Sequence, residues 1–241
     1  MTNELDGKRA LVTGASRGIG RAICESLWAA GAEIIPVARP SDELDALAAA
    51  CGERCAPWAG DATSDEMLEF IASQHRIDIL VNNVGTNVPK PMTEITDDIL
   101  DRMLDLNVRT TYRVSRQTLG CMPRGGRIVH ISSQMGHVGS PNRTAYCLTK
   151  HAIEGLTKAM AVELAPRGIR VNSVAPTFVE TPMTKPMMED PDFAAFVKRM
   201  IPLGTMASPD DVANAVRYLC GPGGNMITGH SLLVDGGWTA Q

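Results

Sequence analysis

The feature that most constrains the fold is a regular alternation of short apolar runs with longer segments of helical spacing. The runs are rich in Val and Ile and occupy residues 9–13, 33–38, 77–82, 127–132, 169–175 and 231–234, with a weaker one at 54–58. Helical spacing is found over residues 18–30, 42–50, 64–73, 97–119, 144–165 and 209–219. Such alternation is typical of right-handed βαβ units. The sequence therefore predicts an α/β fold, a doubly wound parallel sheet of about seven strands with helices on both faces.

The bulk properties narrow the possible function classes. The chain has 241 residues without a repeat, linker or low-complexity tract, so we expect a single domain over residues 1–241. Its formal net charge of -4 argues against a nucleic-acid partner, because such proteins usually carry a basic face. No apolar run is long enough to cross a membrane, so we expect no membrane partner.

The cysteines and histidines bear on location and metal binding. The six cysteines are scattered, and the first residues lack a signal-peptide pattern. Both observations favour a cytoplasmic protein with reduced thiols. No His or Cys group has metal-ligand spacing, so we expect no metal site.

One long connection departs from the alternation. Residues 176–209 are punctuated by prolines, and only a short helix near residues 191–200 is expected inside them. The segment also holds Met183, Met187, Met188, Met200 and Met206. Long connections in compact domains are usually functional, so we predict a substrate-covering loop. The alternative is that its methionines only fill gaps in the core.

A glycine-rich turn follows the first apolar run and opens the first predicted helix. Gly14, Gly18 and Gly20 have the spacing G-x-x-x-G-x-G. Glycines permit a tight turn and close backbone approach, and a helix N-terminus offers free N–H groups to a phosphate. With a strand before it and a helix after it, the turn predicts a Rossmann-type dinucleotide site. The candidate contacts in this turn are Gly14, Ser16, Arg17, Gly18, Ile19 and Gly20.

The end of the second predicted strand bears on cofactor choice. A site that reads NAD usually places an acid there for the ribose 2′-hydroxyl, but Ala38 occupies that position and Arg39 follows. A guanidinium suits a 2′-phosphate, and Arg17 adds a second cation. We therefore favour NADP. Asp42 and Glu43 are near enough in sequence to act as ribose ligands, which keeps NAD open.

Tyr146 and Lys150 are four residues apart in a predicted helix and therefore share a face. This spacing alone also fits an ordinary amphipathic helix. Two further residues strengthen a catalytic interpretation. Ser133 lies at the carboxyl end of the fifth predicted strand, where open α/β sheets bind ligands. Asn107 is a polar residue within an apolar stretch of the preceding helix.

Together these features resemble the short-chain dehydrogenase/reductase family over essentially the whole chain. The matching residues are Thr13, Gly14, Gly18, Ile19, Gly20, Asp61, Asn82 to Gly85, Asn107, Ser133, Tyr146 and Lys150. The resemblance implies a hydride transfer between a nicotinamide cofactor and a carbonyl or secondary alcohol. It assigns catalytic roles to Asn107, Ser133, Tyr146 and Lys150.

In the family's chemistry, Tyr146 would be the general acid/base and Ser133 would polarise the substrate oxygen. Lys150 would lower the pKa of the Tyr146 phenol and hold the nicotinamide ribose, and Asn107 would anchor a water chain. The resemblance adds cofactor contacts at Asp61, Ala62, Asn83, Gly85, Pro176, Val179 and Thr181, besides Arg39, Tyr146 and Lys150. Thr177 stands where the family usually has glycine, which leaves the local backbone shape open.

For the substrate, the sequence looks most like the sugar and polyol branch of the family, which implies a sugar, polyol or small dicarbonyl. The candidate substrate residues are Ser133, Gln134, Asn142 and Tyr146, with His137 and Arg143 beside them. The alternative is that these polar side chains only occupy the surface of a loop and do not contact the substrate. A second hypothesis is a 3-oxoacyl thioester reductase, whose acidic carrier protein would meet Arg102, Arg109, Arg113 and Arg116. A non-catalytic nucleotide sensor is less favoured, since the catalytic set is complete. The resemblance also implies a homotetramer built through the two long helices and the apolar C-terminal end.

Overall fold

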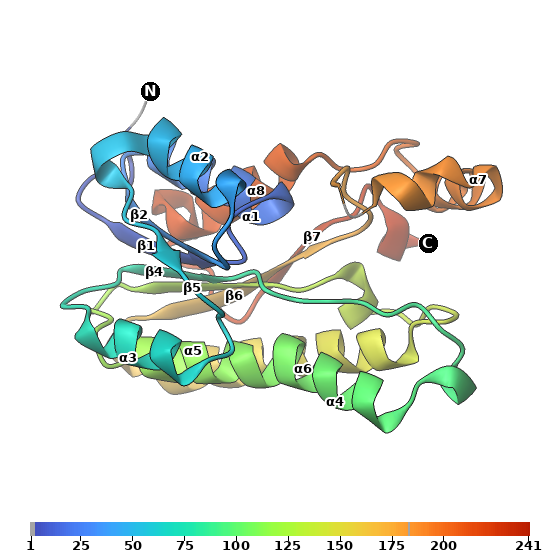
Figure 1. Cartoon of the computed structure of the whole chain (residues 1–241), viewed down its shortest axis with the longest axis horizontal. Helices are drawn as coiled ribbons and strands as arrows, with labels where there is room; N and C mark the ends of the chain where they lie inside the picture. Colours follow the sequence, from blue (N-terminus) through green and yellow to red (C-terminus); the bar gives the residue numbers. More distant parts are fainter. Residues whose placement is uncertain (1–2, 183) are drawn as a thin grey trace.

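The computed structural model describes residues 3–182 and 184–241, so Met183 of the predicted loop lies outside the described residues. Seven parallel strands form one sheet in the order β3-β2-β1-β4-β5-β6-β7 (Figure 1). The strands are β1 (Arg9–Thr13), β2 (Glu33–Ala38), β3 (Trp58–Ala59), β4 (Ile79–Asn82), β5 (Arg127–Ile131), β6 (Arg170–Pro176) and β7 (Ser231–Val234). The predicted α/β class, parallel sheet and strand number are confirmed.

Helices cover both faces of this sheet (Figure 1). One face is covered by α1 (Gly18–Ala29), α2 (Asp42–Cys51) and α8 (Pro209–Cys220). The other is covered by α3 (Asp65–Ser73), α4 (Asp97–Leu104), α5 (Thr110–Thr118) and α6 (Thr144–Leu164), while α7 (Pro191–Met200) lies apart within the long connection. None of the helices in the described residues combines the length and apolar character needed to cross a bilayer.

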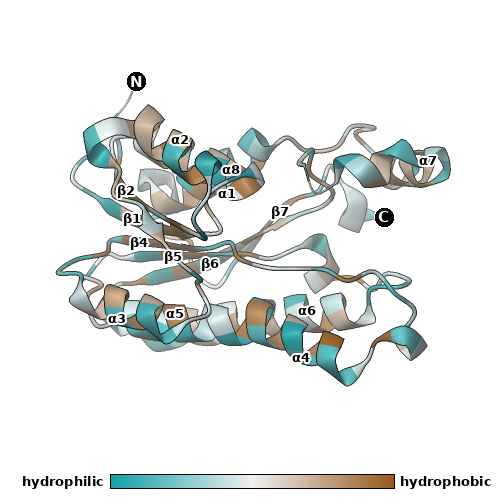
Figure 2. Ribbon diagram, viewed as in Figure 1, coloured by the Kyte–Doolittle hydropathy of each residue, from teal (hydrophilic) through white to brown (hydrophobic). Residues whose placement is uncertain are grey.

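Alternate strand residues supply two separate cores. Val12 and Val81 belong to the cluster under α1 and α8, whereas Leu11 and Leu80 belong to the cluster under α3, α5 and α6. This follows from the two-residue period of a strand, which sends successive side chains to opposite faces. Figure 2 shows hydrophobic residues along the central strands between the two helix layers. A sheet buried on both faces holds its carboxyl edge rigidly, and the site lies at that edge.

Two predicted elements differ from the structure. The expected helix over residues 97–119 is interrupted by a π-helical turn at Asp105–Arg109, so α4 and α5 are separate. The weak strand expected at residues 54–58 begins only at Trp58. Cys55 makes a single bridge with Ile34, and Pro57, which has no N–H to donate, then breaks the ladder.

The predicted covering loop and the C-terminal end share a third, smaller core. Val197, Ile201 and Trp238 are buried together there, and Phe178, Met188, Phe193, Phe196, Met200 and Met206 pack around them. Some of the methionines therefore fill a core, as the alternative proposed. Met187 instead lines the cavity described below.

Candidate active site

A cavity of about 860 Å³ opens at the carboxyl ends of the central strands. It brings together residues from the turns after β1, β2, β3, β4, β5 and β6 and from α6. The predicted site residues that line it are Gly14, Ser16, Arg17, Gly18, Ile19, Gly20, Arg39, Asp61, Ala62, Asn83, Gly85, Ser133, Gln134, Tyr146, Lys150, Pro176, Val179 and Thr181. Two predicted residues, Asn107 and Asn142, are not among its lining residues.

The glycine turn forms one wall of the cavity, and its backbone requires glycine at specific positions. Gly14 and Gly18 have φ values of +67° and +55°, in the left-handed region that strains other residues. A Cβ at Gly20 would lie 2.2 Å from the Gly14 carbonyl oxygen, so no larger residue fits. No side chain caps the N-terminus of α1, which leaves first-turn N–H groups available to an anion. These features fit a bound pyrophosphate.

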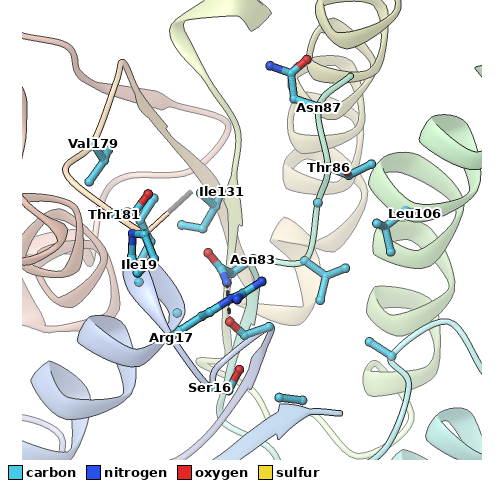
Figure 3. A pocket seen from close by; sticks show the side chains of 18 of the residues that line it. Ser16, Arg17, Ile19, Asn83, Thr86, Asn87, Leu106, Ile131, Val179 and Thr181 are labelled. Carbon is cyan, nitrogen blue, oxygen red and sulfur yellow. Dashed lines mark hydrogen bonds between the residues drawn. The ribbon is translucent and has the colours of Figure 1, made fainter. Parts of the chain in front are cut away.

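Asn83, which is labelled in Figure 3, and Thr13 connect the glycine turn to the end of β4 through hydrogen bonds. The Asn83 side-chain amide donates to the carbonyl oxygens of Thr13 and Gly14, at 3.0 Å each. The Thr13 hydroxyl in turn accepts from the backbone N–H groups of Asn83 at 3.0 Å and Val84 at 3.2 Å. This reciprocal pairing holds two loops at a fixed distance, as a preformed cofactor site requires.

Charged residues from the segments that follow β1, β2 and β3 line another part of the cavity. Arg17, Arg39 and Glu43 all line it. The Asp61 carboxylate accepts hydrogen bonds from the Thr63 backbone and hydroxyl, and these bonds, aided by Arg39, lower the pKa of Asp61. A hydrogen bond from its own backbone N–H, helped by Ser41 and Arg17, lowers the pKa of Glu43. Both arginines predicted to read a 2′-phosphate therefore line this part of the cavity.

Elsewhere along the cavity, α6 and the turn after β5 position the proposed catalytic groups. The Lys150 ammonium donates to the Ile131 carbonyl at 2.8 Å and lies 5.6 Å from the centre of the Tyr146 ring. The Ser133 hydroxyl donates to the Gln134 side-chain oxygen at 2.7 Å and accepts from the Met135 N–H at 3.1 Å. Tyr146, Lys150 and Ser133 thus converge on one end of the cavity.

Burial controls the ionisation of these groups. Desolvation raises the pKa of Tyr146 to about 12, and Ser133 and Arg143 only partly oppose it. Lys150 is not among the groups that oppose this rise, and its lowering of the Tyr146 pKa stays a prediction. Desolvation also lowers the pKa of Lys150 to about 8, against the opposing charge of Glu154. At neutral pH Lys150 therefore still carries its positive charge for most of the time, and it loses that charge above a pH of about 8.

Asn107 lies behind the cavity wall in the π-helical turn. Its side-chain oxygen accepts from the Thr86 N–H at 2.7 Å, and its amide donates to the Thr86 carbonyl at 2.9 Å and the Thr149 hydroxyl at 3.1 Å. The residue is 2 % exposed. Asn107 therefore braces the loop after β4 against α6, and its role as an anchor of a water chain stays a prediction.

The remaining predicted substrate residues differ in position. Gln134 lines the cavity and is buried, as predicted. Asn142 does not: it occupies an exposed turn with φ +59°, where its carbonyl accepts from the Lys90 N–H. His137 points instead to Ser231, at 2.9 Å. Asn142 is close to Tyr146 in sequence, which is why a substrate contact is expected there. In the structure it lies in the turn before α6, outside the cavity lining.

Several lining residues were not predicted from the sequence. Asn87, Ser132 and Thr177 each contribute a buried oxygen that has no hydrogen-bond partner within the described residues. Figure 3 shows Asn87 and Thr86 on the loop after β4, above Asn83. In the sequence Thr177 is distinctive only because it stands where the family usually has glycine. In the structure its backbone does not adopt a positive φ. The threonine therefore fits without backbone strain.

Comparison with known proteins identifies relatives along the whole chain. Residues 14–239 match a family model described as Enoyl-(Acyl carrier protein) reductase. L-xylulose reductase of Bos taurus is 39 % identical over 100 % of both chains. The 3-oxoacyl-acyl-carrier-protein reductase FabG of Vibrio harveyi is also 39 % identical, over 97 % of this chain and 98 % of its own.

Solved structures also match along nearly the whole chain. A short-chain dehydrogenase/reductase from Serratia marcescens superposes with a TM-score of 0.92 at 36 % identity, covering 98 % of this chain and 99 % of its own. A protein from Beutenbergia cavernae, described as an NAD(P)-dependent gluconate 5-dehydrogenase with bound NADP, superposes with a TM-score of 0.91 at 35 % identity over 100 % of both chains.

Proposed function

The chain belongs to the short-chain dehydrogenase/reductase family and is an oxidoreductase, and from that premise we propose that it reduces or oxidises a sugar, polyol or small dicarbonyl with NADP. The observation that carries the proposal is the single cavity that joins the glycine turn to Ser133, Tyr146 and Lys150. When bound, the nicotinamide cofactor supplies or accepts the hydride. The substrate resembles those named for the L-xylulose reductase relative.

In this proposal, the protein's own groups handle the proton and the orientation of the substrate. The Ser133 and Tyr146 hydroxyls bind the reacting oxygen, and Tyr146 donates its proton as the carbonyl is reduced. A pKa of about 12 keeps the phenol protonated at neutral pH, which is the form that donation requires. In the oxidative direction Tyr146 must first lose its proton to solvent, and its phenolate then accepts the proton of the substrate hydroxyl. The phenolate fraction grows with pH, so oxidation becomes faster as pH rises.

Polar residues beside the proposed catalytic groups support a hydroxylated substrate. Ser133 and Gln134 both line the cavity, and hydroxyl groups of a sugar or polyol can hydrogen-bond to them. A long acyl chain offers no such bonds, which favours the sugar, polyol or dicarbonyl class.

Arg17 and Arg39 support NADP as the preferred cofactor. Both line the cavity, where Arg39 lies near Asp61 and Arg17 near Glu43, and their guanidinium groups suit a 2′-phosphate. The Beutenbergia cavernae structure has NADP bound at low occupancy. Glu43 also lines the cavity, so the competing assignment is NAD with Glu43 on the ribose.

A 3-oxoacyl thioester reductase is the second candidate, because the Vibrio harveyi relative has that activity in its name. It would need a basic face for an acidic carrier. Two of the four arginines proposed for this face are already paired, Arg109 with Asp105 and Arg113 with Asp65. This pairing reduces the net positive charge available to a carrier.

The deciding experiment follows reduced-nicotinamide absorbance with purified protein against L-xylulose, diacetyl and an acetoacetyl thioester, each with NADPH and NADH. We expect oxidation of NADPH with the sugar or the diketone and little with the thioester. Turnover of the thioester alone would replace the proposal with acyl reduction. A preference for NADH would instead favour NAD as the cofactor, with the Glu43 carboxylate bound to its ribose hydroxyls.

We further propose a cytoplasmic homotetramer. The six cysteines are all free, as is usual in a reducing compartment. Tyr112 of α5 and Leu148 and Val162 of α6 are at least half exposed, which leaves apolar surface for a partner chain. Trp238 does not support the proposed C-terminal contact, because it is buried in its own chain.

A further inference from the structure

A buried carboxylate lies behind the catalytic groups and has no part in the proposed reaction. Glu154 is on α6, four residues after Lys150 and eight after Tyr146, so the three share one face of the helix. Its side chain is only 5 % exposed. A glutamate is almost never this buried unless it is paired, so the site requires an explanation.

The partners of Glu154 come from three other elements. The Ser173 hydroxyl of β6 lies 3.1 Å and 2.9 Å from the two carboxylate oxygens, and the Ser231 hydroxyl of β7 donates at 3.1 Å. His137, in the turn after β5, approaches to 3.5 Å. These groups fix the carboxylate, but apart from His137 none can carry a positive charge.

Apart from His137, whose side chain is 29 % exposed, the surroundings of Glu154 offer few counter-charges and exclude much of the solvent. At Gly136 the turn after β5 packs closely against α6. A Cβ on residue 136 would lie 3.1 Å from the Glu154 side chain, the Ser132 hydroxyl and the Lys150 carbonyl oxygen. His130 of β5 is buried, and desolvation lowers its pKa to about 3, so it is neutral. Lys150, also buried, is therefore the one fixed cation that the described part of α6 presents on this buried face.

We propose that Glu154 is a positioning residue for the reaction, acting as the buried counter-charge that keeps the Lys150 ammonium protonated from behind the active site. Two opposite charges in a low-dielectric interior stabilise each other strongly, and each alone is costly. Lys150 can hold a cofactor ribose and assist Tyr146 only while it is charged. The catalytic consequence rests on the proposed function, whereas the charge coupling itself does not.

The first test needs no cofactor and measures the free energy of unfolding against pH in urea. Burial lowers the pKa of folded Lys150 to about 8, below that of the unfolded chain, so folded protein binds fewer protons above that pH. The Lys150 contribution to stability, taken as the difference between wild type and Lys150→Met, should therefore rise with pH from about 8 upward; the difference cancels the buried cysteines, whose raised pKa values act in the opposite direction. Glu154→Gln lowers the folded pKa further, and we expect the rise to begin about one pH unit lower.

Two variants separate charge coupling from simple loss of packing. In a Lys150→Met background, Glu154→Gln should no longer move the onset of the rise, because no lysine remains to titrate. Glu163→Gln, an exposed change of the same charge on α6, should leave the onset unchanged. An unmoved onset in Glu154→Gln, or the same movement without Lys150, would overturn the proposal.

The second test measures kcat/KM for reduction between pH 6 and 9.5. With the Lys150 pKa lowered by about one unit, Glu154→Gln should lose about fivefold at pH 8 and less at pH 6.5. Glu154→Asp, which keeps the charge, should restore much of the loss. If the stability onset moves but no carbonyl is reduced, the proposed function fails and the charge coupling stands. If carbonyls are reduced and the onset does not move, the coupling alone fails.

Discussion

Tyr146 is the residue on which the proposed chemistry depends most. In the proposed reaction its hydroxyl is the proton donor, whereas the proposed cofactor contacts are spread over several loops that line the cavity. Tyr146→Phe should therefore lower turnover by roughly 10²- to 10⁴-fold, the usual contribution of a general acid. Cofactor affinity, followed by fluorescence titration with NADPH, should change little. Near-normal turnover in this variant would remove Tyr146 from the proposed role.

Arg39 is the residue that should decide between the two cofactors. It lines the cavity near Asp61. Loss of a charge-assisted bond to a 2′-phosphate should raise the KM for NADPH by roughly tenfold or more in Arg39→Ala, with little change for NADH. Arg21→Ala is the matched control, because Arg21 pairs with Glu25 on α1 outside the cavity. Equal effects on both cofactors would contradict a phosphate-reading role.

The residues that sequence could identify are those with a fixed spacing or a backbone requirement. Gly14, Gly18 and Gly20 were predictable because the turn geometry demands glycine, and Tyr146 and Lys150 because they share a helix face. Asn87 and Thr177 were not, since their importance comes from facing the same cavity from different loops. The raised pKa of Tyr146 was also hidden, because desolvation is a property of the folded surroundings.

At the scale of elements, strand positions were well predicted and one helix was not. Buried parallel strands need continuous apolar runs, which Val and Ile mark clearly in the sequence. The interruption between α4 and α5 leaves no such mark, because its residues have ordinary helical character. The π-helical turn places Asn107 opposite Thr86, and that pairing exists only in the folded chain.

The Asn107 brace yields a prediction about this element. Asn107→Leu has a similar volume but leaves the Thr86 N–H and carbonyl without their side-chain partner. We expect a loss of about 2 kcal/mol in the free energy of unfolding, with a larger proportional loss of turnover as the loop after β4 shifts. Urea unfolding and steady-state kinetics measure both.

Thr149→Val is the control for this change, since it removes only one of the three hydrogen bonds to the Asn107 side chain. It should cost clearly less stability than Asn107→Leu. If Asn107→Leu is as stable and active as the wild type, Asn107 does not brace the site.

At the scale of the whole molecule, the order of the strands determines where the site can form. The chain passes from β3 at one edge back to β4 beside β1, so the loops after β1 and β4 diverge on either side of the cavity. Ligands bind at such a reversal point in open α/β sheets. Alternation in the sequence predicts parallel strands, but strand order depends on packing between distant segments and only the structure gives it.

The surface of α5 and α6 carries the last prediction, which concerns assembly. Val162 is 79 % exposed and Tyr112 50 %, although both are apolar residues on regular helices. If these helices form the proposed tetramer contact, Val162→Glu buries a charge at the interface, and light scattering should show smaller species than the wild-type tetramer. Circular dichroism should still show a folded α/β chain, because the side chain lies outside the cores. Met92→Glu, an equally exposed apolar position (73 %) outside these helices, should leave the assembly intact. A wild-type protein that scatters only as a monomer would refute the tetramer, and a Val162→Glu tetramer would place its contacts elsewhere.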